Sequence, residues 1–210
     1  MRPEPPNGPA IHAAADFRGT GGPGDRHRVN ILSRIVARKT EEIADARRRT
    51  PTEALRDAVA ARRDQRSLYA ALKEPGPRGA NIIAEIKRAS PSKGPLRMDL
   101  DPAELGRAYA TGGAAALSVL TDRDFFHGAP EDLVAARRAV ALPVLRKDFL
   151  IDDYQLYESS AMGADAVLLI CRILSARQLA GLLALSRSLG MEALVEIHTA
   201  ADLAMAREVK

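Results

Sequence analysis

Residues 82–96 read IIAEIKRASPSKGPL, a short apolar run that leads into a polar loop containing Ser, Pro and Gly. Successive side chains of a β-strand point in opposite directions, so Ile83, Glu85 and Lys87 share one face of the predicted strand. A buried strand has no structural need for two opposite charges, because removing even a paired charge from water is unfavourable. The stretch therefore predicts a strand that delivers a carboxylate and an ammonium group to a functional site.

The same arrangement returns twice downstream. Residues 143–149 read PVLRKDF and contain a short apolar strand that ends with Lys147, and residues 193–198 read ALVEIH and contain another that ends with Glu196. For Glu85 and Lys87 taken alone, a structural ion pair is the favoured alternative. If the three strands are parallel neighbours, however, their charged ends meet where α/β folds build active sites. The candidate catalytic residues are then Glu85, Lys87, Lys147 and Glu196.

Apolar runs near residues 82, 117, 144, 167 and 194 are separated by segments with helical spacing. This alternation predicts a parallel sheet with helical crossovers, either doubly wound or closed as a (β/α)8 barrel. No Gly-x-Gly-x-x-Gly motif follows a strand and no phosphate-binding loop of the Walker type is present. A barrel of about five βα units is therefore favoured over residues 79–210.

The segment before the first strand divides into two parts. Residues 1–28 are rich in Pro and Gly with few large apolar side chains, which predicts a disordered extension. Residues 29–78 show apolar positions at helical spacing, and Thr50-Pro51 is expected to break them into two helices that pack on the barrel.

Composition limits the possible function. The chain has 210 residues, 46% hydrophobic content and a net charge of +4, with most of the excess positive charge in the first 78 residues. Aromatic residues make up 4% and basic residues alternate with acidic ones, so nucleic-acid binding is not expected. No apolar run has the length of a membrane span or of a secretory signal, which predicts a cytoplasmic protein with no membrane partner.

Five segments, in this order, resemble the indole-3-glycerol phosphate synthase family over roughly residues 31–210. They are residues 83–92 (IAEIKRASPS), 117–121 (LSVLT), 125–128 (FFHG), 143–149 (PVLRKDF) and 194–198 (LVEIH). The resemblance implies a TIM barrel with an N-terminal helical extension. It also implies a carboxy-lyase of tryptophan biosynthesis that closes the indole ring of 1-(2-carboxyphenylamino)-1-deoxyribulose 5-phosphate, an anionic small molecule, without a metal or organic cofactor.

The resemblance also implies residue roles. Lys147 matches the general acid of the family, and Lys87 matches a lysine that binds the anionic substrate and has been assigned a proton-donor role. Glu196 matches the carboxylate that assists dehydration, and Glu85 matches one that orients the lysines and stabilises positively charged intermediates. A well-placed acid typically contributes about 10² to 10⁴ in rate.

Three further residues are implied to bind the substrate. Phe126 and Phe149 match aromatic residues that wall the anthranilate ring, and Ser90 belongs to a mobile loop after the first strand. Taken alone, the two phenylalanines are more commonly core residues. His198 is expected to be structural, because it lacks neighbouring residues of metal-ligand type.

The sequence also departs from the family. We find no counterpart of its sixth to eighth strands, whose loops hold the substrate phosphate, and a complete barrel takes about 250 residues. We therefore expect a C-terminally truncated barrel that is inactive or poorly soluble alone and able to associate through its open edges. The alternatives are a catalytically dead fragment that binds a partner and another phosphate-binding barrel, such as phosphoribosylanthranilate isomerase.

Overall fold

The computed structural model describes residues 31–76 and 79–209; the extension predicted for residues 1–28 lies outside this part of the chain. Within it, five strands form one sheet in which every neighbouring pair is parallel, in the order β1-β4-β5-β6-β7. They are β1 (Ile83–Ile86), β4 (Ala116–Leu120), β5 (Val144–Lys147), β6 (Ala166–Ile170) and β7 (Glu192–Glu196). Spatial order therefore follows chain order, as in a (β/α)8 barrel, and the prediction of an incomplete barrel is confirmed.

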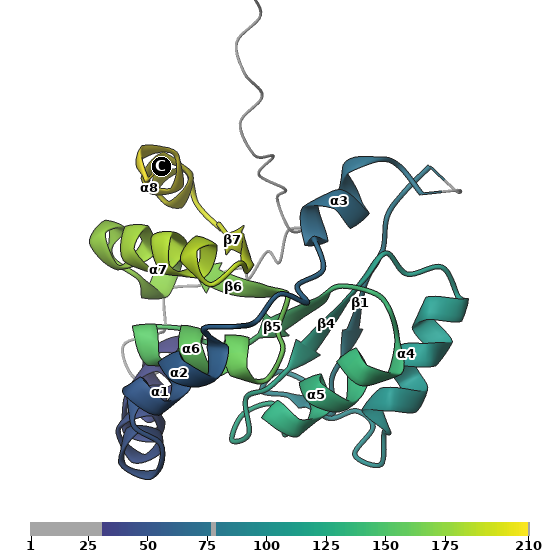
Figure 1. Cartoon of the computed structure of the whole chain (residues 1–210), viewed down its shortest axis with the longest axis horizontal. Helices are drawn as coiled ribbons and strands as arrows, with labels where there is room; N and C mark the ends of the chain where they lie inside the picture. Colours follow the sequence, from purple (N-terminus) through teal and green to yellow (C-terminus); the bar gives the residue numbers. More distant parts are fainter. Residues whose placement is uncertain (1–30, 77–78, 210) are drawn as a thin grey trace, which may run out of the picture.

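A helix follows each strand and covers the outside of the sheet (Figure 1). The first two of these helices pack side by side next to β1 and β4, and the last two lie at the β7 end. They are α4 (Pro102–Thr111), α5 (Pro130–Ala139), α6 (Asp153–Ala161), α7 (Ala176–Ser188) and α8 (Ala200–Glu208), with a short 3-10 helix η1 (Cys171–Ile173) before α7. No helix in the described part of the chain is long and apolar enough to span a membrane.

The sheet buries a different apolar cluster on each face. Ala84 and Ile86 point outward into the larger cluster, which includes Leu133 of α5 and Leu179 of α7. The inner cluster contains side chains from the three central strands, namely Ala116, Leu145, Ala166, Leu168 and Ile170, with Ile83 of β1 packed against it. The alternation predicted for residues 82–87 is therefore confirmed, because Glu85 follows Ile83 on the inner face.

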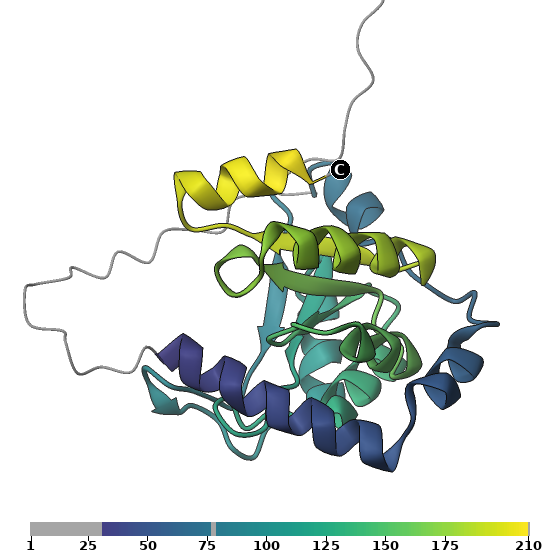
Figure 2. The same ribbon diagram turned by 90° about the vertical axis from the view of Figure 1, so that its left-hand side faces the viewer.

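Among the described residues before β1 there are three helices, not the two predicted: α1 (Ile31–Arg49), α2 (Thr52–Val59) and α3 (Leu68–Lys73). The break predicted at Thr50-Pro51 separates α1 from α2. The second break spans residues 60–67, where the chain forms hydrogen bonds with the sheet in place of a continued helix. Figure 2 shows α1 running along one side of the molecule, away from α7 and α8.

Asp165, directly before β6, anchors this second break at the amino end of the sheet. Its Oδ1 accepts a hydrogen bond from the backbone N–H of Arg66 at 2.9 Å, and its Oδ2 accepts one from that of Val144 at 3.0 Å. Arg62 donates to the backbone carbonyls of Gly163 and Ala164 at 2.9 and 2.6 Å. These hydrogen bonds to distant residues replace those that a continued helix would form. Apolar spacing within residues 60–67 carries no information about such distant partners, so it did not indicate the break.

The loop after β1 contains a small antiparallel hairpin of β2 (Ala89–Ser90) and β3 (Gly94–Pro95). Gly94 adopts φ +66°, a conformation that favours glycine. The backbone N–H of Ala89 donates to the carbonyl of Phe126 at 3.2 Å. The hairpin therefore lies against the loop that follows β4.

Candidate active site

A cavity of about 340 Å³ opens at the carboxyl ends of the central strands. Its floor is apolar, with Leu120, Leu168 and Ile170 from β4 and β6. The first turn of α1 closes one side through Ile31 and Leu32. The remaining lining residues are charged, ionisable or aromatic: Phe126, Lys147, Asp148, Phe149, Arg172, Glu196 and His198.

Lys147 and Glu196 face each other in this cavity as the last residues of β5 and β7. The Nζ of Lys147 donates to Oε2 of Glu196 at 3.2 Å, and the two side chains are 29% and 17% exposed. Both residues come from strand ends, where backbone pairing stops and a side chain can reach the mouth of the barrel. An ammonium group and a carboxylate at hydrogen-bond distance can supply a proton and accept one.

Glu196 also forms a hydrogen bond with His198, between Oε1 and Nε2 at 2.7 Å. Burial would raise the pKa of Glu196, but the charge of Lys147 and the hydrogen bond with His198 outweigh it and hold the pKa below its ordinary value. The carboxylate is therefore ionised at neutral pH. His198, expected to be structural, lies in the cavity lining as a partner of Glu196.

Glu85 and Lys87 form a second ion pair, on the inner face at the carboxyl end of β1. In the strand register, Ile86 pairs with Val119 and Lys147 pairs with the next residue, Leu120. All four predicted charges therefore lie at the same end of the sheet, but in two separate pairs. Within the described residues, Glu85 and Lys87 are not part of the cavity lining.

Phe126 and Phe149 form an aromatic pair in the cavity wall, with ring centroids 6.0 Å apart and planes tilted by 40°. They come from the loops after β4 and β5. Tilted rings at this distance interact favourably and leave apolar faces for a further planar ring. Ser90 lies in β2 beside these loops, where its Oγ accepts a hydrogen bond from the backbone N–H of Lys93 at 3.2 Å; it does not line the cavity formed by the described residues.

Sequence reasoning missed three charged residues beneath the aromatic pair: Lys39, Asp122 and Asp148. Their side chains are at most 4% exposed, and Lys39 forms an ion pair with each of the two aspartates. A signal was present, since Lys39 lies four residues after Ile35 and four before Ile43, on the buried stripe of α1. In residues 31–76 and 79–209, no group of three or more His, Cys, Asp or Glu side chains is arranged to hold a metal ion.

An open parallel (β/α) sheet with an acid–base pair at the carboxyl ends of its strands defines an enzyme of the TIM-barrel class. A family model described as "Indole-3-glycerol phosphate synthase" matches residues 32–210. The chain belongs to the indole-3-glycerol phosphate synthase family, whose members are carboxy-lyases of tryptophan biosynthesis.

Curated relatives carry the same name. The protein of Syntrophobacter fumaroxidans is 50% identical over 179 residues, which cover 85% of this chain and 68% of the relative. That of Laribacter hongkongensis is 53% identical over 175 residues, which cover 83% and 66%, and that of Bordetella pertussis is 52% identical over 176 residues, which cover 83% and 67%. The chain thus spans about two thirds of the length of these relatives.

Proposed function

We propose that this chain supplies the acid–base part of an indole-3-glycerol phosphate synthase. The reaction closes the ring of 1-(2-carboxyphenylamino)-1-deoxyribulose 5-phosphate to indole-3-glycerol phosphate, with loss of carbon dioxide and water. The observation that carries the proposal is the Lys147–Glu196 pair in a cavity beside two aromatic rings. Because the chain spans about two thirds of its relatives, the proposal concerns the role of these residues within a whole barrel.

In the proposed mechanism, the aromatic ring of the substrate attacks the ketone carbon of the sugar and Lys147 protonates the developing alkoxide. Glu196 then accepts a proton as the hydroxyl group leaves in the dehydration step. The lowered pKa of Glu196 supports this role, because it keeps the carboxylate available as a base at neutral pH. His198 supports it as well, by a hydrogen bond to the carboxylate oxygen that is not bonded to Lys147.

The proposal gives the second ion pair an electrostatic role. Lys87 binds the anionic substrate and is a second candidate proton donor, and Glu85 orients the lysines and stabilises positive charge on the intermediates. Phe126 and Phe149 wall the anthranilate ring. Ser90, in the hairpin after β1, belongs to a loop that closes over the bound substrate and excludes water.

We further propose that residues 29–78 act as an extension packed on a partial barrel of residues 79–210, in the cytoplasm and without nucleic-acid or membrane partners. A second candidate function, binding of a protein partner through an open edge, is favoured by one observation. Every residue of the edge strand β7 is only partly buried, and α8, which follows it, buries no residue. A fragment of this kind would associate through β7.

The test uses the chain alone and a hybrid in which the final third of the Laribacter hongkongensis relative is appended. We expect formation of indole-3-glycerol phosphate by the hybrid and little or none by the chain alone. Lys147→Ala in the hybrid should nearly abolish turnover while the substrate still binds in calorimetry. Near-normal turnover by this variant would remove Lys147 from the role of acid. Isomerase activity on phosphoribosylanthranilate would instead favour the related barrel, and an inactive hybrid would favour the partner-binding fragment.

A further inference from the structure

Lys39 is a charged residue in an apolar position. It lies on the stripe of α1 that also contains Ile35 and Ile43, and it is 3% exposed. Placing an ammonium group there is costly unless the protein supplies opposite charges and hydrogen bonds. The groups that surround the Lys39 ammonium therefore indicate the role of this buried charge.

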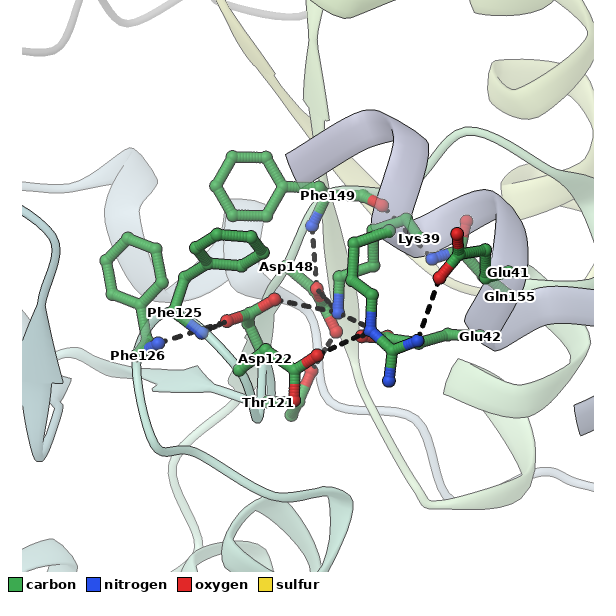
Figure 3. A network of polar contacts seen from close by, with 12 residues as sticks. Lys39, Glu41, Glu42, Thr121, Asp122, Phe125, Phe126, Asp148, Phe149 and Gln155 are labelled. Atoms are coloured by element: carbon green, nitrogen blue, oxygen red, sulfur yellow. Dashed lines mark hydrogen bonds and ion pairs between the residues drawn. The ribbon is translucent and has the colours of Figure 1, made fainter. Parts of the chain in front are cut away.

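Three carboxylates surround the Lys39 ammonium (Figure 3). Nζ lies 2.9 Å from Oδ2 of Asp122, 3.1 Å from Oδ1 of Asp148 and 2.8 Å from Oε2 of Glu42. Burial would lower the pKa of Lys39, but the charges of Asp148 and Asp122 outweigh it and hold the pKa above its ordinary value. Lys39 is therefore a permanent cation at neutral pH.

Asp122 uses its other oxygen to hold the loop that carries Phe126. Its Oδ1 accepts hydrogen bonds from the backbone N–H groups of Phe125 at 2.7 Å and Phe126 at 3.0 Å. Lys39 is the cation that pairs with Asp122 among the described residues, and Asp122 is fully buried. The position of this loop thus depends on a side chain from the N-terminal helix.

Asp148 performs the same task for the next loop. Its Oδ1 accepts a hydrogen bond from the backbone N–H of Phe149 at 2.8 Å, and its Oδ2 accepts one from Thr121 Oγ1 at 2.6 Å. Arg146 also pairs with Asp148, at 3.1 Å. Charge neutralisation of Asp148 therefore does not require Lys39, but the Lys39 ammonium contacts the carboxylates of both Asp122 and Asp148.

We propose that Lys39 is a positioning residue, whose ammonium group joins the loops after β4 and β5 and so sets the spacing of the Phe126 and Phe149 rings in the cavity. The proposal deepens the proposed function, on which it rests for the identity of the bound ring. It also gives α1 two roles at one site, because the first turn of the same helix lines the cavity through Ile31 and Leu32. Displacement of α1 would then change both the wall and the ring spacing.

The test compares Lys39→Met with Arg62→Met. Both changes remove a largely buried cation that anchors the N-terminal segment, but Arg62 lies at the opposite, amino end of the sheet. In the chain itself, we expect Lys39→Met to abolish the nuclear Overhauser contact between the Phe126 and Phe149 rings, and Arg62→Met to retain it. This readout needs no turnover, so it remains informative if the proposed function fails.

In the active hybrid, Lys39→Met should raise KM by about tenfold, which corresponds to about 1.4 kcal/mol of substrate binding, because the Phe126 and Phe149 rings would no longer be held at the spacing that fits the substrate ring. The value of kcat should change much less, because the Lys147–Glu196 pair does not include Lys39. Arg62→Met should leave both constants unchanged, and Lys39→Arg should recover part of the KM effect. Equal KM values and equal ring contacts in Lys39→Met and Arg62→Met would overturn the proposal.

Asp122→Asn provides a second test if Lys39→Met does not fold. The new carboxamide oxygen can still accept from the Phe125 and Phe126 amides, but the ion pair with Lys39 is lost. We expect a weaker ring contact and a higher KM in this variant. Wild-type values of both would contradict the role assigned to Lys39.

Discussion

Lys147 and Glu196 pair across a strand that separates them: β5 and β7 flank β6, yet Nζ and Oε2 lie 3.2 Å apart. The contact is possible because both side chains project from strand ends toward the mouth of the barrel. It depends on the curvature of the sheet as well as on the sequence order of the strands. The electrostatics of this pair lead to the first prediction.

His198→Ala should raise the pKa of Glu196. Burial raises the pKa of Glu196, whereas Lys147 and the hydrogen bond with His198 lower it. Without His198, only Lys147 of these two residues still opposes the effect of burial. In the wild type, the carboxylate stays ionised to a pH below the ordinary range of glutamate. The acidic limb of the pH–rate profile of the hybrid should therefore move to higher pH in the variant, as should the ¹³C titration of Glu196. An unchanged titration would contradict the role of His198.

The stability contribution of Lys39 should vary with pH in the alkaline range. Its folded pKa lies above the ordinary value of 10.5, so the contribution is fully present below that value and is lost as pH rises toward the folded pKa. Near pH 8, Lys39→Met should lower the free energy of unfolding by about 3–5 kcal/mol, as expected for an unpaired buried partner. Urea unfolding at increasing pH should show the difference from the wild type shrinking above pH 10.5. A constant difference would contradict this account.

Gly128→Ala should destabilise the loop that carries Phe126. A Cβ atom at this position would lie 2.2 Å from the backbone oxygen of Leu120, so the backbone must move. We expect a loss of about 1–3 kcal/mol in the free energy of unfolding. Gly181→Ala is the control, because it lies within α7 with no atom near the new methyl group, and it should be stabilising by about 0.5–1 kcal/mol. Equal effects of the two substitutions would be inconsistent with the close approach.

Asp165→Ala should lower stability without altering the cavity. The buried carboxylate accepts hydrogen bonds from two backbone N–H groups and pairs with Arg137 and Arg62. Removing it leaves these donors and charges unpaired, at a cost of about 3–5 kcal/mol. Thermal unfolding should report the loss, while the contact between the Phe126 and Phe149 rings persists at temperatures where the variant is folded. Loss of that contact would show that the two ends of the sheet are coupled.

Strand alternation and strand ends could be predicted from sequence because they depend on neighbouring residues. The shared inner face of Ile83 and Glu85 follows from period-two spacing, and the terminal positions of Lys147 and Glu196 follow from the ends of their apolar runs. The grouping of the four charges could not be predicted in full. Glu85 and Lys87 form their own pair at the carboxyl end of β1, outside the cavity lining of the described residues, because sheet curvature decides which strand ends meet.

The ion pairs of Lys39 with Asp122 and Asp148 could not be predicted from sequence for a different reason. Helical spacing marks its position as buried, but a lysine in a basic helix is normally assigned to solvent. Its burial is tolerated only because Asp122 and Asp148 arrive from two distant loops. The extra break between α2 and α3 has the same origin, since its hydrogen bonds reach residues near β6.

The bonds of Lys39 and Arg62 also bear on the order of events during synthesis. Helices α1 and α2 leave the ribosome well before the partners of these two side chains, which follow β4, β5 and α6. A nascent chain must therefore hold α1 and α2 undocked until a large part of the sheet has been translated. Such long-range closure slows folding and leaves apolar helix faces open to chaperones in the meantime.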